Sequence, residues 1–349
     1  MTRIFIGLDG RLRSGWRVAG FLVAFLAVQL GVGIAALVAI TAVIALGGGR
    51  LSLGEVTRLG ESSTAQLVCG LAMLPLLLLV VWPFRRFLDR RSYRSLGFWV
   101  DGRTAPDALA GLAAGAALVL GTAGVALVWG LYRWAGAGQE GGIPVLQVVA
   151  ATVGLTAAAL NEELVCRAYV QGNLAEGLGP TGAIALTSGL FSLLHGANPH
   201  TSGLAFINLF LAGVLLGTVY HRFGTLWAPW ALHFAWNFTM GPLLGVSVSG
   251  MRLPSLLRLE LVPQAELAAP DWEAVSGGAF GFEGGLAATM VMALFIVGLA
   301  AWKGRPPRAA EPVGRNAASP PPSTDALPAG AAGPVPEGGL PPAGGVSSG

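Results

Sequence analysis

Long apolar stretches constrain this chain more than any other feature of its sequence. Read with a window of about 20 residues, the sequence offers about eight of them. A helix needs about 20 apolar residues to cross a bilayer, because each residue adds about 1.5 Å. We therefore predict an all-α fold, a polytopic transmembrane helical bundle. The expected spans are 17–46, 65–83, 107–135, 144–172, 181–195, 204–221, 226–246 and 284–302.

Composition supports a membrane location. Of the 349 residues, 54% are hydrophobic and only 11% are charged, whereas a soluble domain usually carries about 25% charged residues. The net charge of +3 does not indicate a nucleic-acid partner, because the arginines cluster beside apolar segments, where topology explains them. The two cysteines, Cys69 and Cys166, both lie inside apolar stretches, so no disulfide framework is expected.

The chain divides into four expected regions. Residues 1–94 hold two spans and a basic loop, and residues 95–246 form a core with most of the intramembrane polar groups. Residues 247–302 hold an acidic loop and the final span. Residues 303–349 are rich in Pro, Gly and Ala and have too few apolar side chains to offset the entropy of ordering, so we expect a disordered tail.

Charge asymmetry predicts the orientation. Short cytoplasmic loops collect Lys and Arg, and with eight spans the three basic segments fall on one side: the N-terminus, residues 85–103 and residues 303–308. The opposite side receives the loop 247–283, which contains two arginines, Arg252 and Arg258, and five acidic residues. These acids are Glu260, Glu266, Asp271, Glu273 and Glu283. Both termini are therefore predicted to be cytoplasmic.

The segment "LNEELVCRAYVQGN" places charges inside an apolar helix. Each charge near a bilayer centre costs about 2.5 to 3.5 kcal/mol, so a function is expected for them. Glu163 and Arg167 are four residues apart and can pair on one helix face. Glu162 points about 100° away from Glu163 and is left without an ion partner. A desolvated carboxylate of this kind is a competent general base for water.

Two histidines lie inside expected spans with companions at helical spacing. His195 ends "FSLLH", and His233 begins "HFAWN", in which Asn237 lies four residues on. Asn237 could hold a water or an oxyanion, or fix the imidazole tautomer. His200 and His221 are expected at the membrane interface.

Each of these features also has a structural interpretation. A lone intramembrane histidine more often serves helix packing than catalysis, and a Glu–Arg pair often only stabilises a helix. Phe191 is expected in the core, and Trp227, Trp230 and Trp236 in an interfacial aromatic belt. The convergence of a spare carboxylate, two histidines and an amide on three neighbouring helices nevertheless favours an active site.

The three motifs resemble those of a known family. "EELVCR" fits E-E-x-x-x-R, "FSLLH" fits F-x-x-x-H and "HFAWN" fits H-x-x-x-N, in the family's order. Over about residues 95 to 245, including "SLGF", the chain is similar to the CPBP intramembrane proteases. This family is also called the Abi or CAAX-protease-like family, and its eukaryotic relatives are type II CAAX prenyl endopeptidases. The resemblance implies that residues 95–246 form a protease core.

The resemblance also implies roles for six residues. Glu162 would activate the attacking water, and His195 would assist or position it. Glu163 and Arg167 would orient that glutamate. His233 and Asn237 would bind the water or stabilise the oxyanion.

A metal is left open. Glu162, His195 and His233 have the donor types of a His2Glu zinc site, yet the H-E-x-x-H of soluble zincins is missing here. We expect no obligatory metal, with zinc as the alternative cofactor. By residue count, Glu162 and His233 fall in the cytoplasmic half of the membrane, whereas His195 lands higher unless its helix is tilted or starts later.

Two other classes of protein compete with a protease. A proton-coupled transporter would be expected to show paired repeats or broken helices related across two halves, which the sequence lacks. A catalytically silent scaffold or bacteriocin self-immunity protein would keep the fold and bind a partner. Composition suggests a bacterial cytoplasmic membrane, with membrane lipid around the protein and a membrane-embedded or secreted peptide or protein as substrate. The sequence does not predict an oligomeric state.

Overall fold

The computed structural model describes residues 2–7, 9–49, 52–60, 63–138, 143–263 and 272–305. These residues belong to one compact unit, Met1–Val313. A second unit, Gly314–Gly349, lies wholly outside the described residues, so the expected tail is outside them from residue 306 onward. Two acids of the loop 247–283, Glu266 and Asp271, are also outside them.

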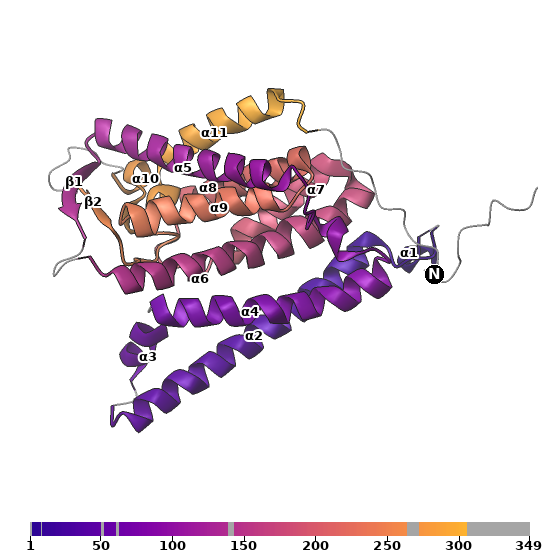
Figure 1. Ribbon diagram of the computed structural model, residues 1–349, viewed down its shortest axis with the longest axis horizontal. Coiled ribbons are helices and arrows are strands. Elements are labelled where there is room, and N and C mark those ends of the chain that lie inside the picture. Colours follow the sequence, from indigo (N-terminus) through magenta and orange to yellow (C-terminus); the bar gives the residue numbers. More distant parts are fainter. Residues whose placement is uncertain are drawn as a thin grey trace, which may run out of the picture. The chain divides into compact units, whose positions relative to one another are not determined.

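Helices dominate the described residues, as predicted (Figure 1). Five stretches in this part of the chain are long and apolar enough to cross a membrane: Ser14–Leu46, Leu67–Leu88, Thr104–Val128, Val145–Leu194 and Gly203–Phe223. The main helices are α2 (Ser14–Leu46), α4 (Ser63–Pro83), α5 (Thr104–Val128), α6 (Val145–Glu163), α7 (Gly172–Leu194), α8 (Gly203–Phe223), α9 (Trp227–Phe238) and α11 (Leu286–Ala301). Short helices are α1 (Thr2–Phe5), α3 (Leu53–Gly60) and α10 (Trp272–Ser276).

The helices in the structure agree with some of the eight expected spans better than with others. The stretch Val145–Leu194 contains two of them, and the chain bends between them at Gly179, whose φ of 68° and ψ of 172° break the helix just before Pro180. Glycine suits this position because its backbone adopts positive φ without steric cost. The expected spans 226–246 and 284–302 contain helices of only 12 and 16 residues, α9 and α11.

Small residues bring helix backbones close together. α5 packs on α9 through Gly111 and Gly115, where an added Cβ would lie 2.2 Å from the Ala228 carbonyl oxygen and 2.3 Å from that of Leu232. Such small-residue faces let helix backbones approach in lipid. The contact fixes α9, the helix that carries His233 and Asn237.

A two-stranded antiparallel sheet was not predicted. β1 (Tyr132–Ala137) pairs with β2 (Leu257–Leu261), from Tyr132 opposite Leu261 to Ala137 opposite Leu257, with a bulge between Trp134 and Gly136. The span expected over 107–135 therefore ends early, at Val128. The sheet lies at the end of the bundle opposite the start of α2 (Figure 1).

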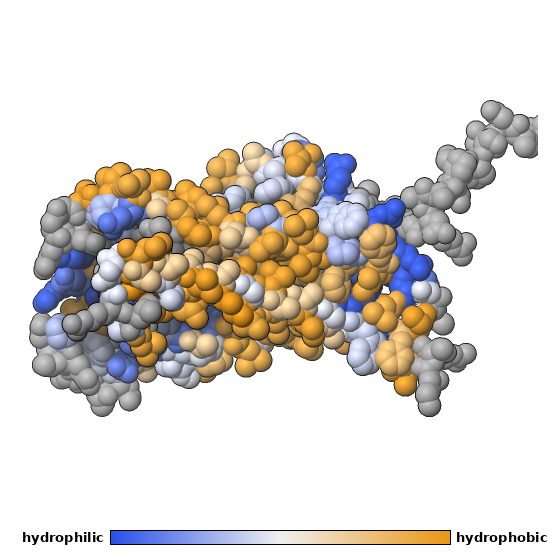
Figure 2. Space-filling view, turned by 90° about the horizontal axis from the view of Figure 1, so that it is seen from below, coloured by the Kyte–Doolittle hydropathy of each residue, from blue (hydrophilic) through white to orange (hydrophobic). Residues whose placement is uncertain are grey.

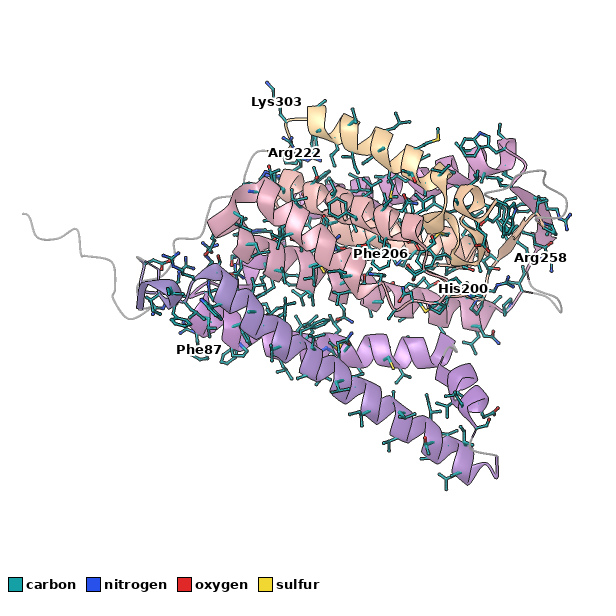
Figure 3. The ribbon with its side chains drawn as sticks, turned by 180° about the vertical axis from the view of Figure 1, so that it is seen from behind. Phe87, His200, Phe206, Arg222, Arg258 and Lys303 are labelled. Atoms are coloured by element: carbon teal, nitrogen blue, oxygen red, sulfur yellow. The ribbon has the colours of Figure 1, made fainter. Side chains whose placement is uncertain are left out.

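Hydrophobic residues cover most of the face in Figure 2, and hydrophilic ones gather toward its two ends. Figure 3 shows Arg222 and Lys303 at one end of the bundle and Arg258 at the other. This distribution fits an integral membrane protein.

Several arginines that topology alone was expected to explain are buried in ion pairs. The guanidinium of Arg17 contacts the carboxylates of Asp89 and Glu176, and Arg85 Nη1 lies 3.0 Å from Asp89 Oδ2. Asp89 is fully buried. Because these residues lie on α2, after α4 and on α7, the cluster ties three parts of the bundle together.

Candidate active site

The two adjacent glutamates lie where the helical hydrogen-bond pattern changes. α6 ends at Glu163 and continues directly as a π-helical segment, Leu164–Gln171, which contains Arg167. Single π-helical turns inside α-helices are frequent at functional sites. Glu162 and Glu163 have different surroundings: the Glu163 side chain is completely buried, whereas that of Glu162 is 37% exposed.

Glu163 pairs with Arg167, as the spacing predicted. Arg167 Nη1 lies 3.2 Å from Glu163 Oε1, and both side chains are buried. The Arg167 guanidinium also lies over the Phe191 ring, 4.4 Å from its centroid. Phe191 is in the core, as expected, and 3% exposed. A buried arginine with a carboxylate on one side and an aromatic face on the other is held firmly.

The hydrogen bonds of the two histidines define their tautomers. His233 Nδ1 is 2.9 Å from Glu163 Oε1, and His195 Nδ1 is 2.8 Å from the Phe191 carbonyl oxygen. Both partners are acceptors, so each Nδ1 donates a proton and each neutral imidazole presents Nε2 as an acceptor. The bond that fixes the His233 tautomer therefore comes from Glu163, and not from Asn237 as one of our alternatives proposed.

The free nitrogens of both histidines face the spare carboxylate. His195 Nε2 is 3.6 Å and His233 Nε2 3.8 Å from Glu162 Oε2. These distances are too long for direct hydrogen bonds, and Glu162 Oε2 has no hydrogen-bond partner among the described residues. The structure thus places His195 at the depth of Glu162 and His233, because the chain turns back at Gly179. A water molecule among these three acceptors can donate its two hydrogens to two of them at a time.

Asn237 lies one helical turn beyond His233 and is 8% exposed. It borders the same cavity as Glu162, His195 and His233. Its amide has no hydrogen bond to another described residue, so it is available to a ligand. The two histidines expected at the interface, His200 and His221, are exposed and lie outside this group; His200 is in the turn between α7 and α8 (Figure 3).

The cavity has a volume of about 340 Å³ and mostly apolar walls. α2 borders it through Phe25, Leu26 and Gln29, and Gln29 is a polar intramembrane residue that the sequence analysis did not consider. The other polar side chains around it are Glu162, His195, Asn198, His233, Asn237, Ser249 and Glu283.

Glu283 is the principal residue that the sequence analysis missed. It was counted with the acids of the loop 247–283, but it is 9% exposed and borders the cavity. Trp236 Nε1 donates to its Oε1 at 3.0 Å, so Trp236 is buried in the bundle and does not form part of the expected aromatic belt. The backbone nitrogen and the hydroxyl of Ser249 donate to its Oε2 at 2.7 and 2.8 Å. No helical spacing in the sequence relates Glu283 to these partners.

The donor atoms of Glu162, His195 and His233 are of the kind that zinc prefers. As placed, however, no group of three or more His, Cys, Asp or Glu side chains in the described ranges has an arrangement suited to a metal ion. That the reaction needs no obligatory metal stays a prediction, with zinc as the alternative cofactor.

Fold and site together define an integral membrane protein of helical architecture whose charged residues surround a cavity between the helices. Residues 144–239 match the family described as type II CAAX prenyl endopeptidase Rce1-like. This match confirms the CAAX-protease-like resemblance over the segment that carries all six expected site residues. The family is a protease family. No curated protein matches the chain.

Proposed function

We propose that this protein is an intramembrane endopeptidase in which Glu162 activates a water molecule. The observation that carries the proposal is the convergence of Glu162 Oε2, His195 Nε2 and His233 Nε2 at the wall of a cavity within the bundle. A general base must lie within reach of the proton that it removes. A water molecule held among these three atoms would meet that requirement.

The reaction begins when Glu162 takes a proton from the water and the water oxygen attacks the scissile carbonyl carbon. The carbonyl oxygen gains negative charge, which the Asn237 amide stabilises by donating a hydrogen bond. When the C–N bond breaks, Glu162 passes its proton to the departing nitrogen. The products are a peptide with a new carboxyl end and a peptide with a new amine.

The remaining site residues act by positioning. Phe191 holds the His195 ring through its carbonyl group, and Glu163 holds the His233 ring. Arg167 neutralises Glu163, so the carboxylate can orient His233 without placing a second uncompensated charge beside Glu162. In this scheme the Glu163–Arg167 pair acts on His233, which in turn borders Glu162.

As placed, Glu162, His195 and His233 are not arranged to hold zinc, so no proposed step passes through a metal. The substrate class that we propose is a membrane-embedded or secreted peptide, and the proposed location is a bacterial cytoplasmic membrane with both termini inside. Arg222 and Lys303 lie at the end of the bundle where α2 begins, which supports this orientation (Figure 3).

Comparison of new peptide termini tests the proposal. Wild type and Glu162→Ala would be expressed at equal level in membranes, and the termini compared by mass spectrometry, with His200→Gln as a control outside the site. We expect products that are present with wild type and His200→Gln and missing with Glu162→Ala. An unchanged set of termini, with folded mutant present, would favour a silent scaffold.

A further inference from the structure

Glu283 places a second carboxylate at the cavity, beyond the segment 144–239 that matches the protease family. It belongs to a 3₁₀ turn, Phe282–Gly284, just before α11. Its side chain accepts three hydrogen bonds, one from Trp236 and two from Ser249. All three are donated to the carboxylate oxygens, so both oxygens act as acceptors.

The charge of Glu283 has no counterion in the described part of the chain. No arginine or lysine there forms an ion pair with it, in contrast to Glu163, which has Arg167, and to Asp89, which has Arg17 and Arg85. A neutral glutamine could not accept all three bonds, because its amide NH2 group donates hydrogen bonds and does not accept them. A carboxylate adds negative charge at a largely apolar wall, where burial of an unpaired charge is costly. A ligand cation would offset that cost.

The geometry limits how far such a cation can be from the reaction centre. Trp236, which donates to Glu283, lies three residues after His233 on α9, and three residues of α-helix rise about 4.5 Å. One residue of extended peptide spans about 3.3 to 3.6 Å. Glu283 also borders the same cavity as Glu162, His195 and His233, so it is within reach of a side chain close to the scissile bond.

We infer that Glu283 is a specificity-determining residue that binds an ammonium or guanidinium group of the substrate near the cleaved bond. This inference rests on the proposed endopeptidase function and adds the chemistry of one subsite to it. Oε1 accepts one protein hydrogen bond and so retains a lone pair for a substrate N–H. The apolar cavity wall suits the aliphatic stem of a lysine or arginine.

Binding of a small cation tests the site without relying on cleavage. The full chain in phosphatidylcholine nanodiscs would be heated with n-octylammonium or with n-octanol, which share the apolar tail and differ in charge. We expect octylammonium to raise Tm more than octanol does in wild type, Glu162→Gln and Glu260→Gln. In Glu283→Gln we expect the two compounds to raise Tm equally. Glu260 is a matched control because it lies on β2, exposed, with Arg258 3.1 Å away. The inference would be overturned if octylammonium still raised Tm more than octanol in Glu283→Gln. It would also be overturned if this extra rise were lost only in Glu162→Gln.

Cleavage of a peptide library gives a second readout, and its first comparison uses wild type alone. The library would be prepared from a proteome with a glutamate-specific protease, so that lysine and arginine occupy internal positions. We expect wild type to enrich Lys and Arg about 10-fold at one position within three residues of the new termini, which corresponds to about 1.4 kcal/mol. Glu283→Asp should retain the preference and Glu283→Gln should lose it.

The outcomes separate the inference from the function on which it rests. Cleavage that depends on Glu162 but shows no basic preference would overturn the role of Glu283 and leave the protease intact. If Glu283→Gln slowed all peptides equally, Glu283 would be only a structural anchor. Failure of wild type to cleave either the library or membrane proteins would overturn both proposals.

Discussion

Replacement of Glu163 by glutamine tests how the buried ion pair supports the site. The substitution keeps the size of the side chain but removes the charge that pairs with Arg167 at 3.2 Å and accepts from His233 at 2.9 Å. Arg167 is 1% exposed and would keep only the Phe191 ring as a partner. Loss of one member of a buried pair costs about 3 to 5 kcal/mol, and the cation–π contact with Phe191 does not change this cost because wild type already has it. We therefore expect Glu163→Gln to lower the free energy of unfolding by about 3 to 5 kcal/mol.

The double variant Glu163→Gln with Arg167→Met should recover much of this stability, because it leaves no unpaired charge in the bundle. It should not recover cleavage. The glutamine oxygen is a neutral and weaker acceptor for His233 Nδ1, and the glutamine NH2 group can instead donate to Nδ1 and select the other tautomer. We therefore expect the cleavage rate to fall at least about 100-fold in both variants.

The assay is equilibrium unfolding in mixed micelles followed by circular dichroism, together with cleavage rates per folded protein. Glu260→Gln is the matched control, because its pair with Arg258 is exposed and worth about 1 kcal/mol or less. Arg167→Met alone completes the cycle. If the destabilisation of the double variant equalled the sum for Glu163→Gln and Arg167→Met, the buried pair would not be coupled as proposed. Full cleavage activity in Glu163→Gln would refute its role in positioning His233.

Three further predictions concern packing, the arginine cluster and the metal. Gly115→Val should destabilise the protein by about 1 to 3 kcal/mol and impair cleavage, since the new Cβ would lie 2.3 Å from the Leu232 carbonyl oxygen. Gly121→Ala is the control, because the nearest atom to its Cβ would be 3.8 Å away, and it should change neither stability nor cleavage. Asp89→Asn should lower the free energy of unfolding by about 3 kcal/mol, because it weakens the buried pair with Arg17, while folded protein still cleaves; complete loss of cleavage in folded protein would contradict this. Cleavage should survive a membrane-permeant chelator, and loss of activity that added zinc restores would show that the metal is required.

Local contacts within the site could be predicted from the sequence. Glu163 and Arg167 pair because residues four apart on a helix are neighbours. Glu162 was correctly expected to have no arginine partner, because its side chain points about 100° away. The grouping of Glu162 with His195 and His233 was also anticipated, since few other intramembrane positions can titrate.

Contacts between distant segments could not be predicted in the same way. β1 and β2 are separated by more than 100 residues, and no periodicity specifies their register. Glu283 reaches the cavity only because the segment before α11 folds against α8, where Asn208 donates to the carbonyl oxygens of Glu283 and Gly285. Its position in an acidic loop gave no sign of burial, and the same is true of the hydrogen bond from Trp236.

The central claim is that Glu162 supplies the base for peptide-bond hydrolysis. The most direct measurement is the single-turnover cleavage rate of a peptide substrate identified from the terminus comparison, with purified protein in nanodiscs. Wild type, Glu162→Gln and His200→Gln would be compared at equal folded concentration. We predict that Glu162→Gln lowers the rate at least about 1,000-fold, whereas His200→Gln stays close to wild type. Cleavage by folded Glu162→Gln at a rate near that of wild type would contradict the claim.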